Sequence, residues 1–166
     1  MTDKRFILLY VILTVIQIVF NNFFGLSRYV LISVLPVLVL MLPARYGRIA
    51  AMLVAFATGF IVDFFSTGML GITSLALVPV ALVGRPITGA AVARQGVARE
   101  DITFKRLGIV GMSYSVALVC AIFFFIYIWA DVAGTVGFWP CALRFLLSVL
   151  ASTLVGVLMA RQIRPE

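Results

Sequence analysis

The sequence predicts an all-α polytopic membrane protein, a compact bundle of six transmembrane helices. Of its 166 residues, 64% are hydrophobic and 11% are charged, whereas a soluble domain is about half apolar and about a quarter charged. A soluble core of this size cannot hide so much apolar surface, so lipid must be the solvent for most of the chain. Fourteen phenylalanines and a mean hydropathy of +1.20 agree with this. We expect a single integral membrane domain over residues 1–166.

Six apolar runs, separated by short polar or glycine-containing breaks, define the predicted spans. Pro36 and Pro79 lie inside the second and fourth runs and are expected to bend those helices. The first run follows a short basic start but lacks a small-x-small cleavage pattern, which predicts a retained helix. The spans cover about 6–24, 29–43, 49–65, 70–84, 107–130 and 139–160.

Basic residues fall almost entirely on one side of these spans. The chain carries thirteen Lys and Arg against six Asp and Glu, for a net charge of +7. With six spans both termini share a side, and eleven of the thirteen basic residues lie there; Arg28 and Arg144 are the exceptions. The positive-inside principle makes that side cytoplasmic. Residues 85–106 are predicted to form a cytoplasmic basic loop that either enforces topology or docks lipid headgroups or a partner.

The residue types disfavour an enzyme, a metal site and a nucleic-acid partner. The chain has no histidine and two cysteines, Cys120 and Cys141, which lie in apolar runs without CxxC spacing. This argues against zinc sites and against Ser-His-Asp or Cys-His catalysis. No phosphate-binding loop appears, and the basic residues lie between apolar runs, where they set topology. We therefore predict no catalytic, cofactor-binding or metal-binding residues.

Residues 59–71 join the third and fourth runs and hold the one acid within an apolar run, Asp63. Gly68 is predicted to supply a positive φ in the turn. Gly59 and Gly71 are predicted to let helix backbones approach closely, as small residues do in membranes.

A carboxylate such as that of Asp63 raises the free energy of a membrane helix unless it is paired with another group or hydrated. One structural interpretation is an ion pair with Arg144, at similar predicted depth, or with Arg28. Another is a carboxylate that accepts backbone N–H groups at the turn. A functional interpretation is a proton or ion site. The structural interpretations are favoured.

The stretch 59–66, followed by Leu70-Gly71-Ile72-Thr73-Ser74-Leu75, resembles the signature hairpin of the MreD family of bacterial rod shape-determining membrane proteins. The shared pattern is a glycine, an Asp four residues later, a short turn and a Leu-Gly pair. The chain departs from the family at Thr73-Ser74, where many members have Asn and Ala.

This resemblance implies a non-enzymatic scaffold in the bacterial inner membrane, with both termini cytoplasmic. Members of the family act with MreC, the MreB filament, RodA and a class B penicillin-binding protein, and the complex directs lateral peptidoglycan synthesis. Their fold is distantly similar to the six-helix substrate-binding subunits of energy-coupling-factor vitamin transporters. The candidate structural or interaction residues are Gly59, Asp63, Gly68, Gly71 and Arg144.

A vitamin-binding subunit of such a transporter is the alternative function. Those subunits commonly present small residues on the first helix, whereas residues 6–16 are bulky here, and the outer connection 25–28 is short. A polar or aromatic pocket open to the outer face would favour this alternative.

Overall fold

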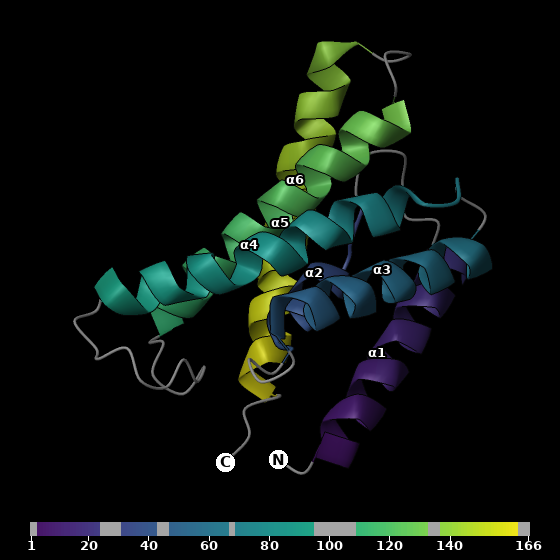
Figure 1. Cartoon of the computed structure of the whole chain (residues 1–166). Helices are drawn as coiled ribbons and strands as arrows, with labels where there is room; N and C mark the ends of the chain where they lie inside the picture. Colours follow the sequence, from purple (N-terminus) through teal and green to yellow (C-terminus); the bar gives the residue numbers. More distant parts are fainter. Residues whose placement is uncertain are drawn as a thin grey trace.

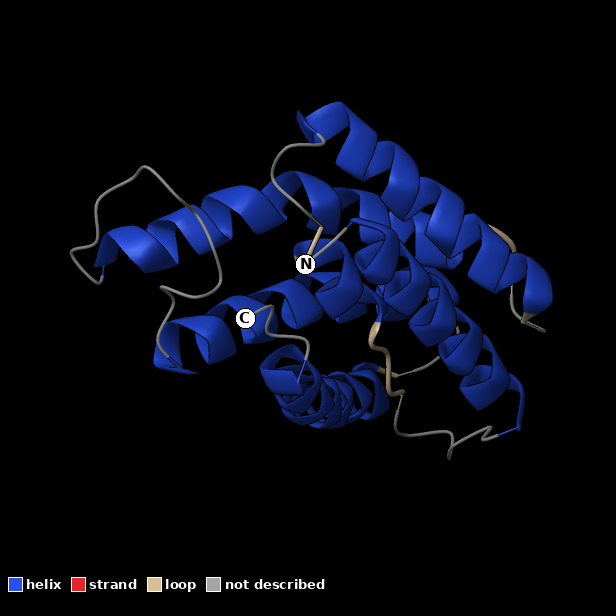
Figure 2. Cartoon of the chain, turned by 90° about the horizontal axis from the view of Figure 1, so that it is seen from below, coloured by secondary structure: helices blue, strands red, loops and turns tan. Residues whose placement is uncertain are grey.

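The computed structural model describes residues 3–23, 31–42, 47–66, 69–94, 109–132 and 137–162. All regular structure in these residues is helical, which confirms the all-α prediction for them (Figures 1 and 2). The helices are α1 (Asp3–Phe23), α2 (Leu35–Leu40), α3 (Gly47–Phe65), α4 (Ile72–Arg94), α5 (Ile109–Val132) and α6 (Phe138–Gln162).

Four helices are long and apolar enough to cross a membrane, which indicates a multi-pass membrane protein. The qualifying stretches are Gly47–Phe65, Ile72–Gly89, Val110–Val132 and Trp139–Met159. The apolar part of α1, Ile7–Phe23, is shorter. The outer surface is apolar as well: Leu150, Leu154 and Leu158 on α6 are each at least 60% exposed. Such a surface suits lipid rather than water.

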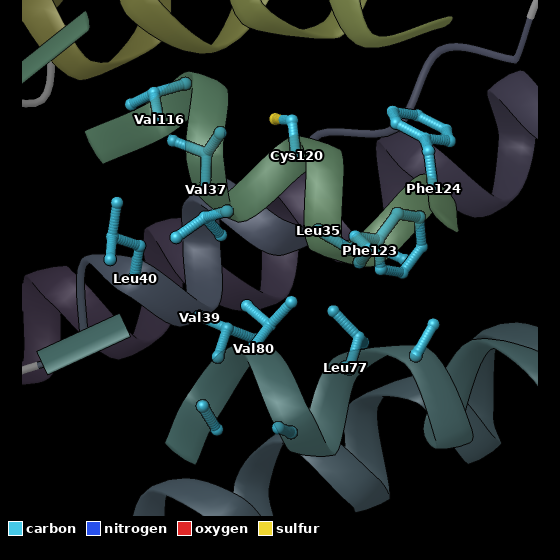
Figure 3. Packing of buried hydrophobic residues seen from close by; sticks show 14 of the residues in the cluster. Leu35, Val37, Val39, Leu40, Leu77, Val80, Val116, Cys120, Phe123 and Phe124 are labelled. Atoms are coloured by element: carbon cyan, nitrogen blue, oxygen red, sulfur yellow. The ribbon is translucent and has the colours of Figure 1, made fainter. Parts of the chain in front are cut away.

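The core lies where α2 meets α4 and α5. All six residues of α2 are buried. Figure 3 shows the side chains of Leu35, Val37 and Val39 between those of Leu77 and Val80 on α4 and those of α5. Phe123 and Phe124 are among the largest fully buried side chains. The shortest helix is therefore the most enclosed element of the described chain.

The predicted helix over 29–43 is wrong in length. Within its described residues, 31–42, the helix is Leu35–Leu40, and residues 31–34 before it have no regular structure. Pro36 lies in the first turn of α2, where its missing N–H breaks no helical hydrogen bond. The proline thus starts a short helix instead of bending a long one.

Helices α1 and α3 run in the same direction. The Tyr10 hydroxyl of α1 lies 2.8 Å from Thr58 Oγ1 of α3. At the end of both helices, Asn22 Nδ2 donates to the Phe65 carbonyl at 2.9 Å. The chain between them must therefore return past them, and residues 31–42 are the described part of that return. The start of α1 and the end of α6 lie on one side of the molecule, at the bottom of Figure 1.

Helix α4 extends beyond its predicted end near residue 84. It continues to Arg94 with Pro79 and Pro86 inside it, so the first ten residues of the predicted basic loop 85–106 are helical. Packing does not stop at Gly84, because Ile87 contacts the core and Thr88 is buried. Residues 95–106 lie outside the described part of the chain.

Candidate functional site

Gly59 brings α3 and α4 into backbone contact. A Cβ at this position would lie 2.6 Å from both the Cα and the N of Ser74. Beside this contact, the Ser74 hydroxyl donates to the Phe56 carbonyl at 3.2 Å. The predicted close approach at Gly59 is confirmed. This contact holds α3 and α4 together.

Gly71 has a different role from the predicted one. A Cβ here would meet nothing within 4 Å, but the residue has φ +96°, a conformation that favours glycine. The prediction of close approach at Gly71 is therefore wrong, and the residue serves the turn instead. Gly68, to which positive φ was assigned, lies outside the described residues.

Asp63 caps the start of α4. Its side chain is buried, at 6% exposure, and its Oδ2 accepts hydrogen bonds from the N–H groups of Gly71 at 2.9 Å and Thr73 at 3.0 Å. A carboxylate at a helix N-terminus satisfies orphan donors and faces the positive end of the helix dipole. These bonds confirm the interpretation of Asp63 as a backbone cap.

Arg144 does not join the hairpin. Its Nη1 lies 2.9 Å from Asp131 Oδ2, the one ion pair found among the described residues. Asp131 is near the end of α5 and Arg144 is in the second turn of α6, so the connection between these helices brings the two charges together. The predicted Asp63–Arg144 pair is wrong, and Arg28 lies outside the described residues.

Three buried polar side chains hold the irregular segment 31–34; we name Gln17, Ser148 and Ser152 the polar latch. Ser148 Oγ and Ser152 Oγ accept the N–H groups of Leu31 and Ser33, each at 3.0 Å. Gln17 accepts the Val34 N–H and donates to the Ile32 carbonyl, both at 3.0 Å. Irregular backbone at membrane depth persists only where the protein supplies such partners.

The polar latch was not among the predicted site residues, although the sequence holds signals for it. Gln17 is a polar amide within the apolar run of the first helix, and polar groups at that depth need a partner. Ser148 and Ser152 are one helical turn apart, and Gly156 follows at the same spacing. A Cβ at Gly156 would lie 2.6 Å from Val37 Cγ2, so this small-residue face of α6 fits closely against the returning chain.

A small pocket lies between the hairpin and the latched segment. Its volume is about 30 Å³, room for roughly two waters and far below the roughly 300 Å³ of small-molecule sites. Ser33 Oγ is buried without a hydrogen-bond partner. The lining residues are Asn21, Leu31, Ile32, Ser33, Leu35, Thr73, Phe123, Phe124 and Tyr127.

No group of His, Cys, Asp or Glu in the described chain is arranged to hold a metal ion. Comparisons with protein-family models, with curated proteins and with solved structures find no match.

Proposed function

We propose that this chain is a non-enzymatic membrane scaffold of the bacterial cell-elongation machinery. In this proposal it binds MreC and helps to direct lateral peptidoglycan synthesis and to maintain rod shape. RodA, the class B penicillin-binding protein and MreB are further partners, and lipid surrounds the bundle.

The hairpin is the observation on which this proposal rests. The residues through which the sequence resembles the MreD family each have a separate structural task here. Gly59 permits helix contact, Asp63 caps α4, and Gly71 makes the turn at positive φ. These residues act together in one hairpin, and this supports the proposed relation to the MreD family.

The proposed topology has six crossings, with both termini in the cytoplasm. Five are helical, and the sixth is the return through residues 31–42, whose irregular backbone the polar latch satisfies. The lopsided distribution of Lys and Arg in the sequence supports this orientation. Trp129 and Trp139, which flank the α5–α6 connection, are 78% and 82% exposed, as expected for an aromatic belt at the outer interface.

The transporter alternative has one observation in its favour. The pocket is lined by polar and aromatic groups, including Asn21, Tyr127 and Phe123. Its volume of about 30 Å³ is too small for a vitamin. The exposed face of α1 is also bulky, with Leu8, Val11 and Val15 all more than half exposed. The scaffold is therefore the better-supported function.

Depletion of the protein in its native host tests the proposal in cells. We expect depleted cells to become round or inviable, and plasmid-borne wild-type protein to restore rods. Gly59→Leu should fail to restore them because it forces α3 and α4 apart, whereas Gly89→Ala, in open space on α4, should succeed. Unchanged shape on depletion, together with loss of uptake of a vitamin, would contradict the scaffold and favour the transporter.

A further inference from the structure

We propose that the pocket between the latched segment and the hairpin binds a dehydrated monovalent cation of sodium size. Its polar lining comes from Asn21, Ser33, Thr73 and Tyr127, which belong to four separate parts of the chain. The proposal rests on the open backbone at 31–33, on one unpartnered hydroxyl and on a neighbouring buried carboxylate.

The backbone beside the pocket offers oxygen ligands that a helix would not. In residues 31–34, Ile32 O is engaged by Gln17 and Val34 O accepts the N–H groups of α2. No hydrogen bond within the described residues uses the carbonyls of Leu31 or Ser33. Unwound backbone carbonyls in membrane helices are typical ligands of sodium, and the polar latch keeps this segment unwound.

Ser33 adds a side-chain oxygen that has no other use. Ser33 is 8% exposed and lines the pocket. Its Oγ is buried without a hydrogen-bond partner. Its own N–H donates to Ser152 Oγ, which holds the backbone of Ser33 beside the pocket. A buried hydroxyl without a partner is costly, and an ion or water in the pocket would remove that cost.

The kind of ligand follows from the oxygens and from the size. Hydroxyl and carbonyl oxygens suit hard cations; the Asn21 amide oxygen already accepts a hydrogen bond from Gln17 Nε2 at 2.9 Å and keeps one lone pair. The lining has no carboxylate, which disfavours Ca²⁺ and Mg²⁺. A volume of about 30 Å³ holds one dehydrated ion with at most a water beside it. An organic solute is too large for this volume.

Asp63 supplies the charge that favours a cation over water. Thr73 lines the pocket, and its N–H donates to Asp63 Oδ2 at 3.0 Å, so the carboxylate lies just behind the pocket wall. Among the described residues its partners are two neutral N–H groups, because Arg144 is paired with Asp131. The carboxylate keeps both backbone hydrogen bonds, and its negative charge favours a cation over a neutral water in the adjacent pocket.

The test is the thermal stability of the purified full chain in detergent, titrated with sodium, potassium or choline chloride at constant ionic strength. Sodium should raise Tm saturably by a few degrees over choline, since a ligand that binds only the folded state stabilises it. Ser33→Ala should raise the half-maximal sodium concentration about tenfold or more, as expected for a lost ligand to a charge. Ser115→Ala is the matched control, because Ser115 is buried and its hydroxyl, within the described part of the chain, bonds to Gly111 of its own helix.

Thr73→Val provides a second variant if Ser33→Ala does not fold. It removes a lining hydroxyl but keeps the N–H that Asp63 accepts. Equal Tm in sodium and choline for the wild type would overturn the proposal. So would a sodium response that is unchanged by the pocket variants, which would place the site elsewhere. A loss of stability on Ser33→Ala that is the same in every salt would identify the occupant as water. None of these results depends on whether the chain is a scaffold, because the readout is the stability of the isolated protein.

Discussion

Ser152 of α6 accepts a hydrogen bond from the backbone N–H of Ser33, at 3.0 Å and across 119 positions of the sequence. This contact ties the last helix of the chain to an irregular segment near its beginning. Together with Gln17 and Ser148 it replaces the hydrogen bonds that a continuous second helix would have made. The stability of the bundle should therefore depend strongly on a few polar side chains.

Gln17→Leu should destabilise the protein by about 2–5 kcal/mol. The change leaves both the Ile32 carbonyl and the Val34 N–H without partners in a buried segment. Thr14→Val is the control on the same helix, since the Thr14 hydroxyl bonds only to Tyr10 of its own helix, and it should cost about 1 kcal/mol or less. Thermal unfolding in detergent measures both. Equal losses would show that the amide of Gln17 does not hold the segment.

Ser152→Ala should loosen the returning chain locally. Removal of the acceptor of the Ser33 N–H should raise the exchange of the amides at 31–34 by about tenfold, the equivalent of about 1.4 kcal/mol. Hydrogen exchange read by mass spectrometry provides the measurement. Peptides from α3 should keep their protection, and uniform deprotection of the whole bundle would contradict a local role.

Gly59→Ala should destabilise the hairpin by about 1–3 kcal/mol. The added Cβ would meet backbone atoms of Ser74 at 2.6 Å, and no side-chain rotation can relieve that contact. Gly89→Ala, where nothing lies within 4 Å, should be neutral or stabilising by up to about 1 kcal/mol because alanine favours helix. Both changes are compared by thermal unfolding, and similar effects at the two positions would contradict the backbone contact.

Asp63→Asn should cost less than Asp63→Ala. The asparagine oxygen can still accept an N–H of Gly71 or Thr73, but its charge no longer faces the start of α4. We expect a loss of about 1 kcal/mol for asparagine and about 2–3 kcal/mol for alanine. Unfolding in a common detergent ranks the two variants. Identical losses would mean that the carboxylate does not act as a cap.

Charge reversal separates the two arginine pairings. The double change Asp131→Arg with Arg144→Asp should recover most of the stability that either single change loses, because these residues are paired at 2.9 Å. The effect should be about 1 kcal/mol or less, since both side chains are partly exposed. The double change Asp63→Arg with Arg144→Asp should give no recovery. Recovery in the second case alone would reverse the assignment.

The sequence predicted the features that local pattern determines. Burial of an acid in an apolar run indicated that Asp63 needs partners, and the small residue at Gly59 indicated close packing; both are observed. The prediction that Pro36 bends a helix is wrong because a proline in an apolar run can either bend a helix or begin one. Which of the two occurs depends on whether side chains elsewhere in the chain form hydrogen bonds with the backbone of the residues before the proline, as they do here for residues 31–34.

The contacts that the sequence did not predict are hydrogen bonds and an ion pair whose partners local sequence patterns do not specify. The two serines of the polar latch bond to residues 117 and 119 positions away in the chain, and no local periodicity specifies such a pairing. The predicted pairing of Arg144 with Asp63 rests on depth alone, and depth does not separate Asp63 from Asp131 near the end of α5. Arg144 pairs with Asp131 because α5 and α6 are consecutive in the chain. The Asp63 carboxylate instead accepts hydrogen bonds from the N–H groups of the turn.

Co-purification tests the scaffold proposal most directly. The tagged protein would be captured from detergent-solubilised native membranes and its partners identified by mass spectrometry, with Gly59→Leu as a folding-impaired comparison. The proposal predicts recovery of MreC together with cell-wall synthases for the wild type, and their loss for the variant. Recovery of an energy-coupling ATPase and its transmembrane partner, without MreC, would contradict the scaffold and assign the chain to vitamin uptake.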